Sequence, residues 1–134
     1  MVAVPEFGIS DISFLAGESM ASNYQYHFVE LQSAGYVHKA DSGSATYAPI
    51  GVLQNNPASG EDAAVCVIGA TKLVIDSTGA SYGAWLTCDG SGRGSATTTA
   101  SLVCAVALAD SDTSASSIIP VLLCPGRSHL ATKA

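Results

Sequence analysis

The sequence predicts an all-β protein: a small single-domain β-barrel or sandwich with an extended N-terminal arm and at most one short helix. Short apolar runs recur at fairly regular spacing along the 134 residues, and turns rich in Gly, Asp, Ser and Pro separate them. No stretch keeps a helical apolar period for long. A chain of this length forms one domain of ordinary size that can bury a real core.

The first half of the chain contains two predicted pairs of strands. Residues 26–31 and 36–40 form the first pair, because apolar and aromatic residues flank a short turn that contains Gly. Residues 49–53 and 63–68 form the second pair, on either side of a long polar loop with Pro and Gly. This region therefore reads as a hairpin followed by a second, longer-looped hairpin.

Four further strands are predicted in the second half, at residues 71–75, 84–88, 102–108 and 117–123. Turns rich in Asp, Ser and Gly end the first two of them. The best helical candidate is 96–108, but it begins with β-branched Thr residues, so it could form one short helix at most.

A weak internal duplication runs through these elements. Residues 51–53 align with 105–107, an offset of 54 (105 − 51 = 54), and a polar loop and a further strand follow each of them. Two copies are too few for a solenoid. We expect them to fold as halves of a single barrel around a shared core.

The composition favours an assembly component. Charged residues make up only 12% of the chain, where about 25% is typical of a soluble domain. A surface poor in charge suits permanent contact with other subunits. The net charge of −6 and the five scattered basic residues argue against a nucleic-acid partner, which needs clustered cations. In a DNA-filled particle, this charge favours the outer face.

No set of side chains in the sequence points to catalysis, a cofactor or a metal. His27 and His38 fall in predicted strands and read as half-buried structural residues. The turn at 89–94, DGSGRG, lacks both the Lys-Ser/Thr of a phosphate loop and the ligand series of a calcium loop, so we expect a flexible hairpin tip. We therefore expect the protein not to be an enzyme.

The four cysteines read as buried small apolar residues of strands, because each lies in an apolar run and none forms a Cys-x-x-Cys pair. Disulfides are possible if the protein is oxidised outside the cell, and their connectivity does not follow from the sequence. The cysteines are Cys66, Cys88, Cys104 and Cys124.

Residues 50–69, IGVLQNNPASGEDAAVCVIG, resemble the signature segment of the capsid cement (head decoration) proteins of tailed phages. Residues 26–41 are similar to the strand pair of that family, and 69–74 are similar to its continuation. The resemblance covers about residues 14–125 and is strong only in the first half.

This resemblance implies a β-rich, β-tulip-like structural protein of the virion that binds the outside of the major capsid shell. It implies a homotrimer that clamps neighbouring capsomers and stabilises the expanded capsid against internal DNA pressure. The partners would be the major capsid protein and further copies of the chain. With no membrane segment or targeting signal visible, we expect synthesis in the host cytoplasm.

The expected organisation is an N-terminal arm at 1–16, a β-rich domain at 17–126 and a C-terminal tail at 127–134. The arm is the hypothesis for the capsid-binding element, because it could add a strand to a neighbour's exposed sheet edge. Alternatively, it forms the first strand of its own domain. The apolar residues proposed to bind the capsid are Val2, Val4, Phe7, Ile9, Ile12 and Phe14.

A recognition module of the virion surface that binds host-cell glycans is the alternative function. The polar loop at 54–60 and the aromatic residues Tyr82 and Trp85 are the features that support it. Since Trp85 falls in a predicted strand, we expect it in the core, which favours the structural function.

Overall fold

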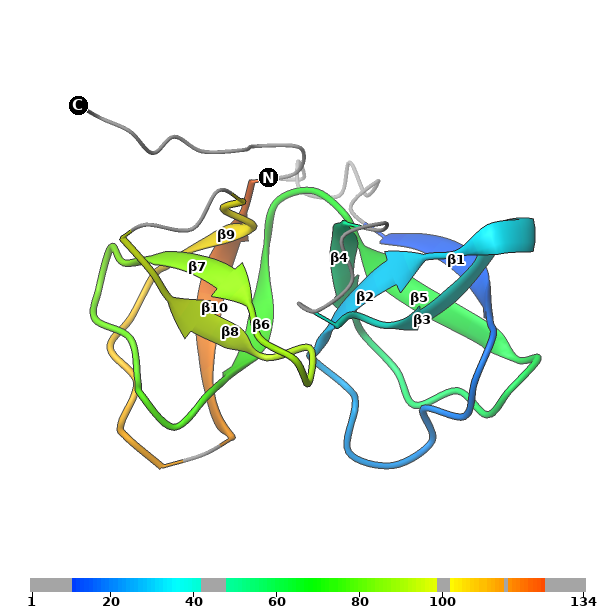
Figure 1. Ribbon diagram of the computed structural model, residues 1–134, viewed down its shortest axis with the longest axis horizontal. Coiled ribbons are helices and arrows are strands. Elements are labelled where there is room, and N and C mark those ends of the chain that lie inside the picture. Colours follow the sequence, from blue (N-terminus) through cyan, green and yellow to red (C-terminus); the bar gives the residue numbers. More distant parts are fainter. Residues whose placement is uncertain (1–10, 42–47, 99–101, 115, 125–134) are drawn as a thin grey trace, which may run out of the picture.

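The computed structural model describes residues 11–41, 48–98, 102–114 and 116–124, and these residues form ten β-strands (Figure 1). The all-β fold class is confirmed. Among the described residues no helix is long and apolar enough to cross a bilayer. The strands are β1 (Asp11–Ala16), β2 (Phe28–Leu31), β3 (Tyr36–Lys39), β4 (Pro49–Leu53), β5 (Asp62–Cys66), β6 (Ala70–Ile75), β7 (Trp85–Cys88), β8 (Gly94–Ala96), β9 (Ala105–Ala107) and β10 (Ser117–Leu123).

The first five strands close into one barrel, which we call barrel 1, in the order β1-β3-β2-β4-β5. Strand β5 returns to pair with β1 in antiparallel register, with Asp11 opposite Cys66 and Leu15 opposite Asp62. Strands β1 and β3 are parallel neighbours, and the remaining pairs are antiparallel. Closure leaves no free sheet edge among the described strands β1–β5.

The last five strands close into a second barrel, barrel 2, in the order β10-β6-β8-β7-β9. Strands β6 and β8 are its parallel pair, and β10 pairs with β6 on one side and β9 on the other. When β1–β5 are matched in sequence with β6–β10, every pair of neighbours and every strand direction is the same in the two barrels.

The backbone registers give the residue-by-residue correspondence. Phe28 and Trp85 hold the same position in β2 and β7, since each begins its strand and each faces the equivalent Val of the next strand. The shift there is 57 residues (85 − 28 = 57). Between β4 and β9 the shift is 54, because Val52 corresponds to Val106, as the duplication in the sequence suggests.

The two copies are complete barrels, and the expectation that they form halves of one barrel is wrong. The reason lies in two further strands. Strand β1 falls within the segment expected to be an arm, for which a first strand was only the alternative, and β8 lies at the end of a Gly-rich turn. Each of these strands supplies the parallel partner, of β3 and β6 respectively, and allows its copy to close by itself. Strand β9 (Ala105–Ala107) lies within the segment 96–108 that was considered above for a short helix.

The two barrels lie side by side (Figure 1), and the three residues 67–69 connect the end of β5 to the start of β6. Barrel 1 has a core of its own around Met20, Val37 and Leu53. A second and larger core fills barrel 2 and extends across the junction to Phe28 and Val52 of barrel 1. The contact between the barrels is therefore part of the hydrophobic core.

Candidate binding surfaces

The junction between the barrels is built around one hairpin turn. We call residues 89–93, between β7 and β8, tip 2; it reaches from barrel 2 onto barrel 1 (Figure 1). The N–H of Phe28 donates a hydrogen bond to the carbonyl of Gly92 over 2.7 Å. A side chain at position 92 would meet Phe28, Lys39 and His27 within 3.4 Å, so the backbone of tip 2 lies directly on these residues. We call His27, Phe28 and Lys39 seat 1.

Hydrogen bonds hold tip 2 in a defined turn, where a flexible hairpin tip was expected. The carboxylate of Asp89 accepts hydrogen bonds from the backbone N–H groups of Ser91 and Arg93, at 2.8 Å each. The same carboxylate pairs with the Arg93 guanidinium, through Nε at 2.8 Å and Nη2 at 2.8 Å. A carboxylate with this many donors fixes a turn without help from secondary structure.

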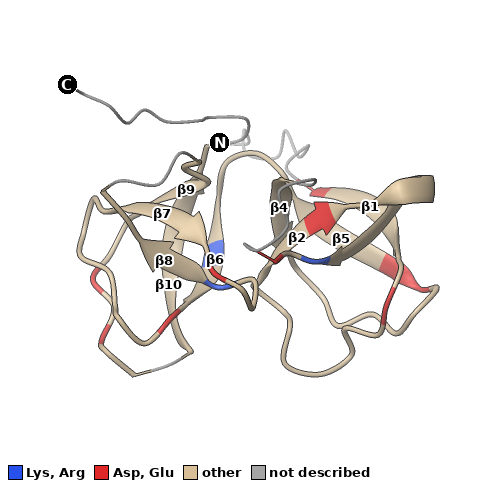
Figure 2. Ribbon diagram, in the orientation of Figure 1, with Lys and Arg blue, Asp and Glu red and all other residues tan. Residues whose placement is uncertain are grey.

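Further contacts join the barrels beside the tip. The N–H of Val74 donates to the carbonyl of Tyr26 over 2.9 Å, and the ammonium of Lys72 lies 5.7 Å from the centre of the Tyr26 ring. The side chains of Gln54 and Thr71 are hydrogen-bonded across the junction at 2.9 Å. The basic residues drawn in Figure 2 lie close to this junction.

An apolar groove of about 320 Å³ opens where the barrels meet, at the side of the molecule where β4 begins and β10 ends. Its lining includes Phe28, Pro49, Ile50 and Leu102. Both ends of the described chain lie at this side, because Asp11 is opposite Cys66 in the sheet and the N–H of Leu123 donates to the carbonyl of Gly69. Residue Ile68, between them, has 59% of its surface exposed.

The cysteines follow the sequence prediction in three cases of four. Cys66, Cys88 and Cys104 are buried, while Cys124 is only partly buried. Burial raises the pKa of the Cys104 thiol to about 12 and raises that of Cys88 as well. These two thiols are protonated at neutral pH and are poor nucleophiles and poor metal ligands. The four thiols are free in this structure.

Of the six residues proposed to bind a capsid, two lie in the described part of the chain. Ile12 and Phe14 belong to strand β1, so this portion of the segment forms the first strand of its own domain, which was the alternative. Phe14 packs against the barrel 1 core, whereas Ile12 has 44% of its surface exposed. The other four, Val2, Val4, Phe7 and Ile9, lie outside the described residues.

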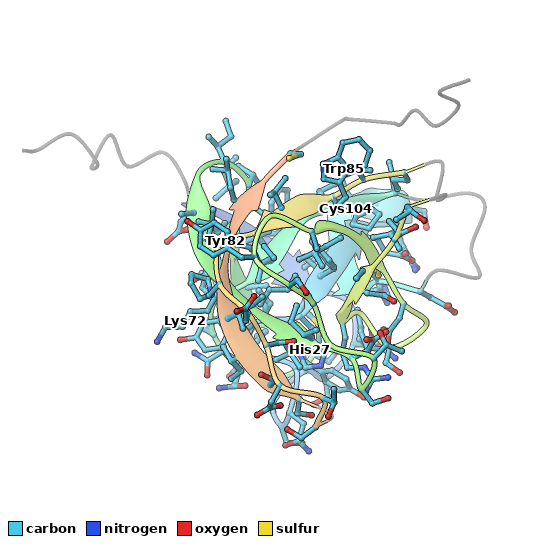
Figure 3. All side chains as sticks on the ribbon, turned by 90° about the vertical axis from the view of Figure 1, so that its left-hand side faces the viewer. His27, Lys72, Tyr82, Trp85 and Cys104 are labelled. Atoms are coloured by element: carbon cyan, nitrogen blue, oxygen red, sulfur yellow. The ribbon has the colours of Figure 1, made fainter. Side chains whose placement is uncertain are left out.

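The features proposed for glycan binding are dispersed. Trp85 is 49% exposed, so the expectation that it is a core residue is wrong. Tyr82 is more exposed still, but the two side chains do not lie side by side in Figure 3. In the loop at 54–60, the Asn55 side chain is engaged by the backbone of Asp62 and Ala64. The Asn55 side chain thus holds the loop to strand β5.

The histidines have structural surroundings. His27 is buried under tip 2, and this burial lowers the pKa of its imidazole. The imidazole of His38 lies 3.8 Å from the Glu18 carboxylate and packs against Gly17. Within residues 11–41, 48–98, 102–114 and 116–124, no three His, Cys, Asp or Glu side chains are grouped as metal ligands would be.

The class of protein that this fold defines is an all-β protein made of two tandem, five-stranded closed barrels of the same topology. Its structure is similar to the crystal structure of the head fibre gp8.5 N base of bacteriophage phi29, with a TM-score of 0.61 and 17% sequence identity. The similarity covers 91% of this chain and 99% of the phage chain, so the shared fold includes both barrels. No protein-family model and no curated protein sequence matches the chain.

Proposed function

We propose that this chain is a structural protein of a tailed-phage virion, attached to the outside of the capsid shell, where it stabilises the expanded shell against internal DNA pressure. The similarity to the phi29 head fibre base over both barrels is the observation that carries the proposal. The resemblance of residues 50–69 to capsid cement proteins points to the same location. The partners in this proposal are the major capsid protein and further copies of the chain, assembled as a homotrimer.

The surface chemistry supports a role in assembly. Ten large apolar side chains are exposed among the described residues, on a chain with very few charges. Where such side chains are contiguous, they mark protein contacts. A net charge of −6 suits the outer face of a shell, away from packaged DNA.

The mechanism of stabilisation is thermodynamic linkage. A protein that binds the assembled lattice, and does not bind separated capsid subunits, stabilises the lattice by mass action. An oligomer that engages several capsomers at once adds the advantage of effective concentration to individually weak contacts. This activity needs no catalytic group, and we propose that the protein is not an enzyme.

The test is addition of the purified chain to expanded heads that lack it, followed by sedimentation and by heating or osmotic shock. We expect saturable co-sedimentation and heads that retain their DNA at higher temperature. Unexpanded proheads are the control, because linkage requires a preference for the expanded lattice. Absence of binding to expanded heads overturns the proposal. Removing residues 2–9 tests whether the N-terminal segment carries the contact, since β1 begins only at Asp11.

Glycan recognition remains the second candidate, and the exposed Trp85 is the observation that favours it. An indole face beside polar groups is typical of sugar-binding sites. A glycan array with the isolated protein separates the two functions: specific binding that Trp85→Ala abolishes favours recognition, and an array without signal favours the structural role.

A further inference from the structure

The contact between the two barrels uses one tip and one seat, although the duplicated fold contains two of each. The turn of barrel 1 that corresponds to tip 2 is residues 32–36, which we call tip 1. It lies at the end of barrel 1 that faces away from barrel 2 (Figure 1). The residues of barrel 2 that correspond to seat 1 are Ala84, Trp85 and Ala96, which we call seat 2. Neither tip 1 nor seat 2 takes part in the contact within the chain.

Tip 1 shares with tip 2 the closing hydrogen bond and the left-handed glycine. It differs at Ala34, in the one-turn 3-10 helix η2 (Ser33–Gly35), which has a φ of +68°, whereas its counterpart Ser91 has no positive φ. In tip 2 the N–H of Asp89 donates to the carbonyl of Arg93 at 2.9 Å, and in tip 1 the N–H of Gln32 donates to the carbonyl of Tyr36 at 2.9 Å. The glycine of each turn has the same left-handed conformation, with φ of +82° at Gly35 and +81° at Gly92. A side chain at position 35 would meet nothing within 4 Å, so the space that barrel 1 fills around Gly92 is open around Gly35.

Seat 2 has the backbone of seat 1, and no turn among the described residues covers the groove over it. The N–H of Thr97 donates to the carbonyl of Trp85, as the N–H of Ala40 donates to the carbonyl of Phe28. A groove of about 450 Å³ is lined by six residues of barrel 2, and they are the counterparts of residues 26–28 and 39–41 of barrel 1. These six are Gly83, Ala84, Trp85, Ala96, Thr97 and Thr98. In barrel 1, tip 2 covers the corresponding position.

Burial differs between the barrels at these matched positions. Phe28 is 1% exposed, and its counterpart Trp85 stands exposed at the periphery of barrel 2 (Figure 3). On the other side of the contact, Val74 is buried beside Tyr26, whereas its counterpart Leu15 in β1 is exposed. Of the ten large exposed apolar residues in the described chain, six fall on tip 1, seat 2 or the strands beside them: Ile12, Leu15, Leu31, Tyr36, Trp85 and Leu108.

From this repetition we infer that copies of the chain associate head to tail: tip 1 of one copy occupies seat 2 of the next, in the way that tip 2 occupies seat 1. The N–H of Trp85 would then donate to the carbonyl of Gly35 in the neighbouring copy. The chain itself contains one such contact, between tip 2 and seat 1. It also presents tip 1 on barrel 1 and seat 2 on barrel 2 for the contact with neighbouring copies.

The side chains keep the two contacts distinct. The contact inside the chain is charged, with Asp89 and Arg93 on the tip and Lys39 on the seat. The contact between chains has no charged residue at matched positions, because Gln32 and Tyr36 replace the ion pair and Ala96 replaces the lysine. Beside the tip, the hydrogen-bonded Gln54 and Thr71 correspond to Leu108 and Ile12, an apolar pair. Tip 2 in seat 2 would bury the Asp89–Arg93 ion pair against a seat without a charged residue, which disfavours incorrect pairing.

A head-to-tail contact either closes into a ring or continues as a filament. A closed ring of three chains contains six barrels and six copies of this contact, three within chains and three between them. The inference rests on the part of the proposed function that makes the protein a homotrimer. It does not depend on capsid binding.

The test uses two complementary variants of the full chain. Trp85→Glu places a charge in seat 2 and leaves tip 1 intact. Gly35→Asn fills the space over tip 1 with a residue that accepts a positive φ, and leaves seat 2 intact. We expect light scattering to find an oligomer for the unmodified protein and a monomer for each variant. An equimolar mixture of the variants retains one good tip and one good seat, so it should form a dimer that grows no further.

Tyr82→Glu is the matched control, since Tyr82 is exposed on barrel 2 outside the groove, and this variant should keep the oligomer. Circular dichroism establishes that each variant is folded, and Trp85→Thr replaces Trp85→Glu if the latter is not. A monomeric unmodified protein, an oligomer that survives both substitutions, or variants that do not complement each other would overturn the inference. An oligomer that fails to bind expanded heads overturns the capsid proposal and leaves this inference standing.

Discussion

The two barrels share a topology but differ in what covers the same patch of backbone. In barrel 1, the start of β2 is covered by a hairpin turn from the same chain, and Phe28 there belongs to the core. In barrel 2, the start of β7 carries the larger Trp85, and no residue of the described chain buries it. The difference teaches that an aromatic residue at one topological position is buried when a turn from elsewhere packs over it, and is exposed when none does. Chain connectivity decides this, and local sequence does not.

Truncation of the two aromatic residues should give the largest difference in stability between the matched positions of the two barrels. Phe28→Ala removes a fully buried ring from the joint core, so we expect a loss of about 3–5 kcal/mol in the free energy of unfolding. Trp85→Ala removes a half-exposed ring and should cost the monomer about 1 kcal/mol or less. Urea unfolding at low protein concentration measures both values. Equal losses for the two variants would contradict the comparison.

Substitution of the glycines in the two tips should give the next largest difference in stability. Ala at either position should lower the free energy of unfolding by about 1–2 kcal/mol, because each glycine has a left-handed backbone. Gly92→Ala should cost about 1–3 kcal/mol more, because its Cβ would lie 3.0 Å from the carbonyl oxygen of Phe28. Gly35→Ala meets no neighbour in the single chain. Thermal unfolding of both variants provides the check, and a larger effect at Gly35 in the monomer would be inconsistent with a free tip.

A smaller difference is expected at the hydrogen bond that joins the barrels. Gln54→Ala removes the side-chain bonds to Thr71 and to the Val52 carbonyl, which should lower the free energy of unfolding by about 1 kcal/mol. At the matched position, Leu108→Ala should weaken association between chains more than it changes the unfolding of the monomer. Urea unfolding and sedimentation equilibrium measure the two effects. A loss of association with Gln54→Ala alone would reverse the assignment of the two contacts.

The junction within the chain should also respond to pH. Burial holds the pKa of His27 below its usual value of 6.5, although Asp89 opposes this effect. The unfolded chain therefore binds a proton near pH 6.5 that the folded chain does not yet bind, and stability rises with pH in this window. We expect a decrease in the melting temperature from about pH 7 to about pH 5, and His27→Gln should remove this part of the decrease. The counterpart Ala84 cannot titrate, so seat 2 has no equivalent dependence.

The sequence predicted the fold class and most of the strands. Residues 49–53 and 117–123 form strands with the predicted bounds, since turn residues and long apolar runs mark both ends. At β1 the sequence leaves an arm and a first strand as alternatives, because nothing in its six residues reveals the two strands that pair with it. Strand β8 consists of Gly94, Ser95 and Ala96, which have little β-propensity, so only tertiary pairing makes it a strand.

The candidate surfaces were much less predictable than the strands. The exposure of Trp85 contradicts its sequence context, which is that of a buried strand. One signal is present in the sequence: the two turns have Gly at matched positions, 35 and 92. The match becomes visible only when β2 is aligned with β7, and this alignment needs the registers of the strands. An offset that changes from 57 to 54 between neighbouring strands obscures the duplication in the sequence.

The three-residue connection between β5 and β6 has a consequence for how such an assembly responds to dilution. A short tether holds tip 2 beside seat 1 at an effective concentration in the millimolar range, whatever the amount of protein present. The contact inside the chain is therefore independent of protein concentration, and only contacts between chains weaken as the solution is diluted. Disassembly should stop at intact pairs of barrels, which are ready to reassociate without refolding.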